Sequence, residues 1–592
     1  MGINANYMTL NTLYLINNSY PPSTSYIKDG NLTVEDAISN YGVGMTHGFY
    51  SGKWYWEVLV SDVGQHLLGF LTLDDFDGQK SQPHNKFGSY LVYTNTSGQG
   101  IRYIEKSFSN ITFSVSDGDI VQFALDRDNR KCWVGLNGTY IESGNPAGNS
   151  NPLFDSSDIS ATTGVFMPVF GTYGAQANKQ TLNAGQDSSF VNQKTSGSAN
   201  ATDDNGFGDF YYTPPTGFLS ACSNNVPTSD DIDPAQTDDD FPGKQCGVVT
   251  YTGNQPTGQT VSGLGFKPDL IWAKMRSSTQ DNQLYNSQVL NSRNTPFMLR
   301  SNSTGAEIDD QAQGNNNEII SSFDTDGFTL GGSNSGPNDA SRTYVAWCWK
   351  ANGGTTASNS DGDITSTVQA NTNAGFSIVT YTGDNTDHRG VGYGSANIGH
   401  GLSKAPEFII TKRRDSTGSW YTYHAGAGIG YLLLESNAVF QSGAVPFGPN
   451  APTTTTFGAY SANNNSGATY VNYCWHSVEG YSKFGKYNGN ADADGTFVYT
   501  GFRPRILIVR PLNVASDGWL MYDTERETFN SLDTILKPHS DAAEYSNAAF
   551  TLDIISNGFK LRSSDNAVNG TAYDPYIYMA WGDVPFKYGN TF

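Results

Sequence analysis

The stretch TYVAWCWK at residues 343–350 occurs three times in related form, since residues 469–476 read TYVNYCWH and residues 575–582 read PYIYMAWG. Alternate side chains of a β-strand point to opposite faces. Three of the tryptophans fall in register, which predicts an aromatic on the same face of each copy. The expected faces in the first copy are Tyr344, Ala346 and Cys348 on one side and Val345, Trp347 and Trp349 on the other, with Trp475 and Trp581 equivalent to Trp349.

Two further segments repeat upstream of this one. The first is a strand that ends in glycine. The second, which follows it, is a proline, then a short apolar strand, then a cation. A sequence unit that recurs indicates a fold that recurs. We therefore expect three cognate β-sandwich domains at residues 246–351, 375–480 and 481–592, with a linker at 352–374. The repeated segments are VTYTGN (249–254), VTYTGD (379–384) and FGKYNGN (484–490), then GFKPDLIWAK (265–274), SKAPEFIITK (403–412) and GFRPRILIVR (501–510).

Composition indicates an all-β fold made of several antiparallel β-sandwiches. Hydrophobic residues make up 37% of the 592 residues and charged residues only 15%, as suits short strands joined by polar turns. No long stretch has apolar residues at the helical period of 3.6. At about 150 residues per domain, the length suits about four domains.

Charge and hydropathy exclude several classes of partner. The net charge of −22 repels phosphate backbones and anionic membranes, and it is explained most simply by solubility. No run of 18 apolar residues predicts a membrane-spanning helix. The N-terminal residues lack the basic and apolar segments of a signal peptide. We expect no nucleic-acid partner and no membrane insertion.

The five cysteines are too scattered for a disulfide framework or a zinc site. Cys348 and Cys474 occupy equivalent repeat positions, where the third copy has Ala580. This pattern favours small buried core residues, and we predict no chemical role for them.

The first 192 residues carry a different series of strands. Trp54, Trp56 and Trp133 are expected to pack in the core between two sheets. Trp54 and Trp56 are two residues apart and should therefore share a face. The strand-like segments are GKWYWEVLV (52–60), LLGFL (67–71), DGDIVQFALD (117–126), RKCWVGLNG (130–138) and FMPVFG (166–171).

The order of these five motifs resembles a SPRY (B30.2-type) domain over about residues 45–192. The resemblance implies a bent, concanavalin-like sandwich of two antiparallel sheets whose loops bind partners. SPRY domains are generally binding modules and not enzymes. The binding loops differ between members, so no binding residue is carried over. We expect a SPRY-like domain at residues 1–192.

Residues 193–245 are expected to be an aromatic and acidic linker. Its aromatic segment FYYTPPTGF (210–218) should pack on the first domain. The acidic segment SDDIDPAQTDDD (229–240) could bind calcium or simply be solvated, and its spacing is not that of an EF-hand.

Turn signals distinguish the middle repeat from the other two. Residues 323–330 and 552–561 place Asp-Gly or Asn-Gly between alternating strands, which predicts hairpins. The middle repeat lacks this signal. In its place, residues 437–456 carry Phe440, Phe447 and two prolines, so its loop should be longer or differently used, through function or through drift.

Catalytic motifs are absent from the sequence. There is no nucleophile elbow, no phosphate-binding loop and no zinc-protease helix, and the glycine-rich run at 390–395 lacks a dinucleotide-binding context. We predict no enzyme activity and name no catalytic, cofactor-binding or metal-binding residue. Two carboxylates suffice for glycoside hydrolysis, which leaves a polysaccharide-degrading activity as a minor alternative.

The arrangement of a SPRY-like domain, an aromatic joint and tandem Trp-Cys-Trp domains resembles structural proteins of marine tailed bacteriophages. It implies a place in the virion, reached by assembly in the host cytoplasm and release by lysis. We expect a tail fibre or tail-associated appendage that recognises a host-surface glycan or receptor. The alternatives are a capsid decoration or connector protein that binds only other virion proteins, and a tailspike-like enzyme. A homotrimer would suit a fibre.

Overall fold

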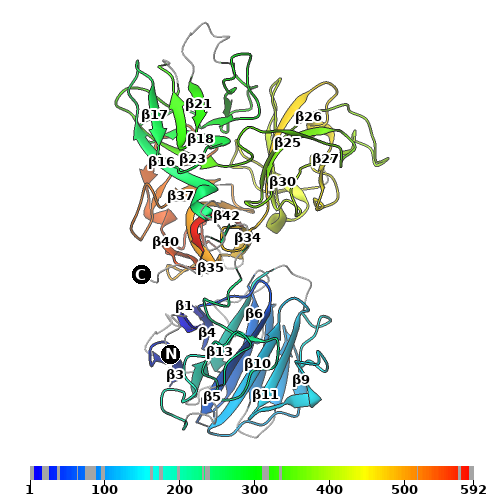
Figure 1. The fold of residues 1–592 in the computed structure, drawn as a ribbon, viewed down its shortest axis with the longest axis vertical. Coiled ribbons are helices and arrows are strands. Elements are labelled where there is room, and N and C mark those ends of the chain that lie inside the picture. Colours follow the sequence, from blue (N-terminus) through cyan, green and yellow to red (C-terminus); the bar gives the residue numbers. More distant parts are fainter. Residues whose placement is uncertain are drawn as a thin grey trace. The chain divides into compact units, whose positions relative to one another are not determined.

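The computed structural model forms two compact units, residues 1–227 and 228–592, which are described separately (Figure 1). No helix among the described residues has the length and hydropathy of a membrane span. The 3-10 turns with described bounds are η3 (Ile141–Ser143), η5 (Pro242–Lys244), η7 (Ala425–Ala427), η8 (Ser461–Asn463) and η9 (Ala548–Phe550). The structure describes residues 6–16, 26–35, 41–62, 64–73, 84, 88–94, 100–159, 164–172, 178–195, 201–227, 229, 232–233, 241–309, 319–332, 336–443, 445–515, 518–570 and 575–585.

The first unit contains two antiparallel sheets, apart from one short parallel pairing of β15 (Leu219–Ser220) with β5 (Lys53–Ser61). A tight hairpin joins the strand-like segments at 117–126 and 130–138, since Asp126 pairs with Lys131. One sheet has the order β1 (Leu10–Ile16), β4 (Gly42–Met45), β13 (Phe166–Thr172), β6 (His66–Thr72), β7 (Ser89–Thr94), β8 (Gly100–Ile104), β9 (Ser107–Ile111). The other has the order β12 (Thr139–Tyr140), β11 (Lys131–Leu136), β10 (Asp119–Asp126), β5 (Lys53–Ser61), β14 (Lys179–Asn183), β3 (Thr33–Glu35), β2 (Ile27–Lys28), with β15 (Leu219–Ser220) beside β5.

Trp54 and Trp56 lie between the two sheets, as predicted. Both are buried, and Trp54 stacks at 4.5 Å on Phe49, which bridges to Phe166 in the opposite sheet. The prediction for Trp133 is wrong in one respect. Trp133 is buried, but it shares a cross-strand row with Tyr55 and therefore faces away from the opposite sheet.

The aromatic segment after residue 200 covers that outer face. Phe210 packs edge-on against Tyr55 at 5.0 Å, and Phe218 against Trp133 at 6.0 Å. This confirms that the segment packs on the first domain. It is also bound by Glu57, a buried carboxylate on β5 that accepts hydrogen bonds from two backbone N–H groups of the segment, from Asn183 and from the Tyr55 hydroxyl. Burial raises the pKa of Glu57 to about 7.

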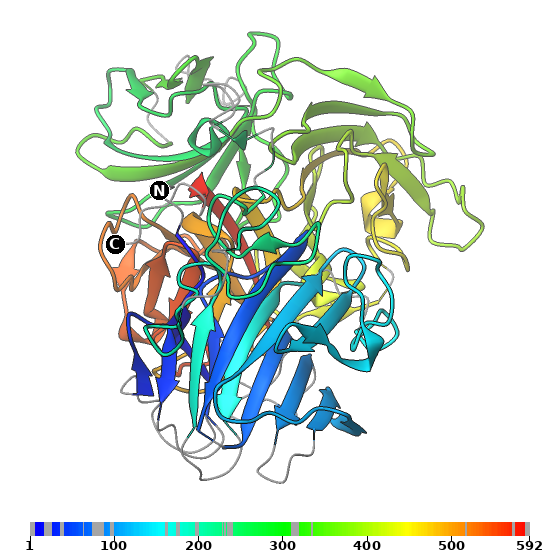
Figure 2. The ribbon, with the colours of Figure 1, turned by 60° about the horizontal axis from the view of Figure 1, so that its bottom comes forward.

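The second unit contains three repeats with one topology. In each, the repeated strand that contains Trp349, Trp475 or Trp581 lies in a large sheet between the glycine-ending strand and the strand that follows the proline. Figures 1 and 2 colour the repeats from green through yellow to red. Repeat 1 has the sheet β16 (Cys246–Thr252), β23 (Thr343–Trp349), β18 (Leu270–Met275), β19 (Gln283–Asn286), β20 (Leu299–Arg300) and the sheet β17 (Gln259–Ser262), β22 (Gly327–Leu330), β21 (Ile320–Asp324).

Repeats 2 and 3 preserve this central strand order. Repeat 2 has β24 (Ala357–Asn359), β25 (Ser366–Asn371), β26 (Phe376–Thr382), β33 (Thr469–Trp475), β28 (Phe408–Arg413), β29 (Trp420–His424), β30 (Gly430–Leu433), β31 (Gln441–Ser442), and the pair β27 (Ala396–Gly399), β32 (Thr456–Ala459). Repeat 3 has β34 (Ser482–Asn488), β42 (Pro575–Pro585), β36 (Phe502–Pro511), β37 (Leu520–Asp523), the sheet β35 (Phe497–Tyr499), β41 (Gly558–Leu561), β40 (Leu552–Ile555), and the pair β38 (Thr534–Ile535), β39 (Tyr545–Ser546).

The strands confirm the predicted hairpins of repeats 1 and 3 and contradict one predicted linker. The hairpins predicted in repeats 1 and 3 are present as β21–β22 and β40–β41. Among the described residues of repeat 2, the small sheet has two strands and no equivalent third one. Residues 352–374 were expected to be a linker, but they contribute β24 and β25, because Ser366–Asn371 pairs with the open edge of β26. The acidic segment at 229–240 lies largely outside the described residues.

The two faces of the Trp-Cys-Trp strand serve different cores, as its alternation predicts. Ala346 and Cys348 point into the core of repeat 1, between its two sheets. Cys474 and Ala580 occupy the same place in repeats 2 and 3, and the two cysteines are fully buried thiols, as predicted.

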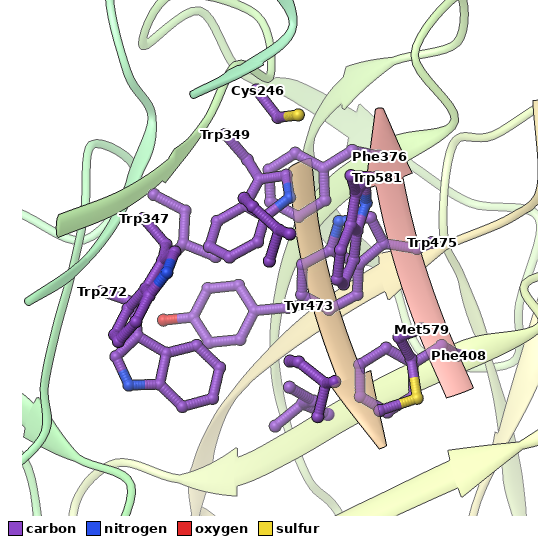
Figure 3. Packing of buried hydrophobic residues seen from close by; sticks show 14 of the residues in the cluster. Cys246, Trp272, Trp347, Trp349, Phe376, Phe408, Tyr473, Trp475, Met579 and Trp581 are labelled. Atoms are coloured by element: carbon purple, nitrogen blue, oxygen red, sulfur yellow. The ribbon is translucent and has the colours of Figure 1, made fainter. Parts of the chain in front are cut away.

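The opposite faces of the three large sheets meet in one central cluster, which includes Trp272, Trp347, Tyr473, Met579 and the three equivalent tryptophans (Figure 3). Trp349, Trp475 and Trp581 are each at most 2% exposed. Their ring centroids are 5.3 to 6.0 Å apart, and the interplanar angles are 67° or 68° in all three pairs. Near-identical pairwise geometry means that the repeats are related by an approximate threefold axis through this cluster.

The strand that follows the repeated proline (β18, β28 or β36) carries a buried cation near its end, and this cation donates a hydrogen bond to a neighbouring repeat. Lys274 donates to the carbonyl of Asp541 in repeat 3, and Lys412 donates to that of Thr304 in repeat 1. Arg510 completes the cycle by donating to the carbonyl of Ala438 in repeat 2. The sequence repeat marked these cations, but their bonding across repeats depends on the threefold arrangement.

A second equivalent contact is made at each of the three interfaces between repeats. The residue two positions after each buried cation accepts, at its carbonyl, a hydrogen bond of 2.9 Å from a backbone N–H of the neighbouring repeat. Two joints add an ion pair, Arg276 with Glu544 and Arg414 with Glu307. The third replaces it with Leu512 and Phe440, which pack at the central cluster. Phe440 of the divergent 437–456 segment therefore has a packing role.

The two buried lysines should make stability depend on pH. Burial lowers the pKa of both Lys274 and Lys412 to about 8, against about 10.5 in the unfolded chain. Between these values the unfolded state binds more protons, so their contribution rises with pH, by at most about 1.4 kcal/mol per pH unit for each lysine. We therefore expect the difference in free energy of unfolding between the wild type and a Lys274→Met/Lys412→Met variant, measured by urea titration, to rise from pH 8 to pH 10. A difference that does not change with pH would contradict this prediction.

Candidate functional site

The aromatic residues singled out in the sequence are not available for ligand stacking. The repeat tryptophans and those of the first unit are buried. In the divergent 437–456 segment, Phe447 packs edge-on against Tyr423 at 5.9 Å within the core of repeat 2. No group of three or more potential metal ligands occurs among the described residues. Most of the exposed large apolar side chains that the structure describes lie instead in connections between strands.

One connection differs from its counterparts. Residues 383–395 join β26 to β27, and the equivalent connections at 253–258 and 489–496 are shorter and contain no aromatic residue. The longer one, called the 383–395 loop below, exposes 53% of Val391 and 68% of Tyr393. Arg389 is also exposed and makes no hydrogen bond or ion pair within the described part of the chain.

The base of this loop is held by an asparagine that recurs in every repeat. Buried Asn464 accepts a hydrogen bond from the N–H of Asp384 over 2.9 Å and donates to the carbonyl of Gly394 over 2.6 Å. Asn338 and Asn569 accept from the corresponding backbone N–H groups of repeats 1 and 3. The common frame thus fixes both ends of the loop.

Two carboxylates organise the interior of the loop. Asp387 accepts from the hydroxyl of Ser395 and from the N–H of Gly392 over 2.7 Å, and these hydrogen bonds lower its pKa. Asp384 bonds to His388 over 2.7 Å. Burial would raise the pKa of Asp384, but hydrogen bonds to its carboxylate hold that pKa below the usual value. Both acids therefore remain ionised, and both accept hydrogen bonds from within the loop, whereas the charged side chain of Arg389 makes none in the described part of the chain.

The backbone at Tyr393 is constrained in an uncommon conformation. Its φ is 62°, in the left-handed region, and its glycine neighbours Gly392 and Gly394 also have positive φ. The Tyr393 carbonyl accepts from the N–H of Ser461 over 2.7 Å. The same region is adopted by Asn385 in this loop and by other non-glycine residues of the chain, so the conformation fixes the backbone here without by itself marking a site. The result is an aromatic ring that projects from a fixed base.

The sequence contained part of this signal. The run at 390–395 fails the dinucleotide-binding pattern, and that test says nothing about a surface loop. The length of the segment between the second Thr-Tyr-Thr-Gly and the next strand would have distinguished it from the other two repeats. The exposure of Tyr393 could not be read from the sequence, because most tyrosines of the repeats are buried.

Comparisons with known proteins place the repeats in a family. A family model described as "Domain of unknown function (DUF7483)" matches residues 241–585. No curated protein matches the chain.

Solved structures similar to part of the chain include two SPRY domains. The TRIM65 PSpry domain has 14% identity and a TM-score of 0.23, and the alignment covers 30% of this chain and 92% of that one. The SPRY domain of human HERC1 has 13% identity and a TM-score of 0.21, with 29% and 96% covered. A stonustoxin structure has 14% identity and a TM-score of 0.22, with 30% and 28% covered.

Proposed function

The chain belongs to the family described as Domain of unknown function (DUF7483), and we propose a function for it from its geometry. We propose that it is a phage virion protein, namely a tail fibre or tail-associated appendage that recognises the host surface. The observation that carries this proposal is the 383–395 loop, which presents Tyr393 from a fixed base on one of three otherwise equivalent repeats. Aromatic faces stack well on sugars and on other apolar surfaces.

The closed construction of the second unit supports a binding role. Its three repeats share a central cluster, so the loops are mounted on a body that has little freedom to rearrange. A rigid base reduces the entropy lost when a surface loop binds a ligand. The proposed partners are other virion proteins and a host-surface glycan or receptor, and the proposed location is the virion. We propose no enzymatic step.

A second observation favours the alternative of a connector or decoration protein. Phe529 in repeat 3 is 85% exposed. The adjacent Asn530 is held in place, because its side-chain amide donates a hydrogen bond to the carbonyl of Ile554 and accepts one from the N–H of Ile554. An exposed apolar ring on a fixed loop also suits a contact with another virion protein. This residue provides a matched comparison for Tyr393.

Binding to intact cells tests the proposal. Labelled full-length protein is applied to a panel of marine bacterial strains, and excess protein is added before infection by the phage that carries it. We expect saturable binding and reduced adsorption, with Tyr393→Ala weakening cell binding about tenfold or more, a loss of about 1.4 kcal/mol. Phe529→Ala should bind cells normally.

The opposite pattern would support the alternative. If the wild-type protein binds no strain, and Phe529→Ala is lost from purified particles while Tyr393→Ala is retained, the chain is a structural connector and the recognition proposal fails.

A further inference from the structure

The 383–395 loop offers two complementary groups for one kind of ligand. Tyr393 provides an exposed aromatic face, and Arg389 provides an exposed guanidinium four residues earlier. The hydrogen bonds from Val391 and Gly392 to the Asp387 carboxylate curl the segment between them. Both side chains therefore belong to one short, internally bonded turn.

Arg389 is the group of the loop that can pair with an anionic group on the ligand, although the ionised Asp384 and Asp387 give residues 383–395 a formal charge of −1, from one Arg against two Asp. Asp384 and Asp387 are occupied by hydrogen bonds within the loop, and His388 is bonded to Asp384. Arg389 is the cation left without a partner among the described residues of this loop. A guanidinium binds a carboxylate through two parallel hydrogen bonds, which gives orientation as well as energy.

The small number of exposed apolar groups favours a sugar over a protein. Stable protein interfaces bury on the order of 1,200 to 2,000 Å² in total. The loop exposes one aromatic and one valine as its large apolar groups, between glycines that have open space around them at Gly390 and Gly392. One ring that stacks on a single monosaccharide, with a charged residue in the same loop, matches this small number of exposed groups.

We propose that the 383–395 loop binds a carboxylate-bearing sugar, with Tyr393 stacked on the pyranose face and Arg389 paired with the carboxylate. This inference rests on the proposed role in host-surface recognition, whose ligand class it specifies. The net charge of −22 opposes acidic polymers at long range, but salt screens that repulsion beyond about 8 Å at physiological ionic strength. At shorter range the proposal requires the Arg389–carboxylate pair to outweigh the repulsion from Asp384 and Asp387.

The probes are polygalacturonate oligomers and the same oligomers after carboxyl reduction, with binding to the full-length chain measured by calorimetry in 0.15 M salt. We expect the acidic oligomer to bind about tenfold more tightly than the reduced one. Arg389→Gln should remove this preference and leave binding of the reduced oligomer unchanged. Tyr393→Ala should weaken binding of both.

Two matched variants control for charge and exposed area. Arg293→Gln removes an exposed arginine from a loop of repeat 1, and Phe529→Ala removes an exposed ring from repeat 3. Neither should change the affinity for either oligomer. If Arg389→Gln behaves like Arg293→Gln, or if the wild-type protein binds neither oligomer, the proposed sugar class is wrong.

The cell-binding experiment separates this inference from the broader proposal. Wild-type protein that blocks adsorption through Tyr393 but shows no preference for the acidic oligomer would retain the recognition role and refute the carboxylate. Capture of a host protein through the loop, with no oligomer bound, would likewise refute the sugar ligand.

Discussion

Replacing Trp475 with alanine is expected to destabilise all three repeats together, although the residue belongs to repeat 2. Its indole packs on Phe376 and Phe408 within its own sheet and edge-on against Trp349 and Trp581 of the other repeats. Truncating a buried tryptophan costs about 3 to 5 kcal/mol through lost transfer energy and the cavity left behind. Because the cavity opens on the shared axis, each neighbouring sheet loses a contact.

Hydrogen exchange of the full chain, read by mass spectrometry, measures this effect. We expect protection to fall together in β23, β33 and β42, the strands that carry the three tryptophans. Trp56→Ala is the matched control, since it removes an equally buried tryptophan from the first unit and should reduce protection there. Loss of protection confined to β33 and its neighbours would mean that the repeats are independent domains.

Replacing Arg526 with methionine is expected to open the joint between repeats 1 and 3. The Arg526 side chain is 1% exposed, and it donates to Asp523 over 2.6 Å and to Glu544 over 2.9 Å. Asp523 also accepts from the indole N–H of Trp347 in repeat 1. Removing one partner from a buried ion pair costs about 3 to 5 kcal/mol, because the remaining charge is left uncompensated.

Calorimetry of the full chain should therefore show a lower unfolding temperature for the transition of the second unit. The control is Arg413→Met, which breaks a partly exposed pair with Asp415 and should cost at most about 1 kcal/mol. Adding Asp523→Asn to Arg526→Met should recover part of the loss, since it removes the unpaired charge. Equal effects of Arg526→Met and Arg413→Met would show that the buried network contributes no more than a surface pair.

The internal threefold arrangement bears on the expected homotrimer. Fibres and spikes present three copies of each surface through three chains, whereas this chain brings three related repeats together by itself. The repeats are equivalent in their core but differ in their loops, so one axis presents three different surfaces. The number of chains in the assembled protein stays a prediction.

The sequence identified the repeated strands because a repeated pattern of apolar and aromatic residues leaves a periodic signal. It placed Cys348 and Cys474 in the cores and Trp349, Trp475 and Trp581 on one face, since alternation along a strand is a local property. It also predicted the two hairpins from Asp-Gly and Asn-Gly. Trp133 was assigned to the wrong face, because the segment that covers it lies some 80 residues further along the chain.

What the sequence determined by itself was therefore the all-β class, the threefold repetition and the two faces of each repeated strand, because these follow from covalent geometry and local pattern. The tertiary structure alone decided that the three tryptophan faces bury one another, that Lys274, Lys412 and Arg510 reach the next repeat, and that Tyr393 is exposed. Each of these three features depends on contacts between segments that are far apart in the chain. Whether a side chain is buried or exposed is decided by such contacts, which a local sequence pattern does not contain.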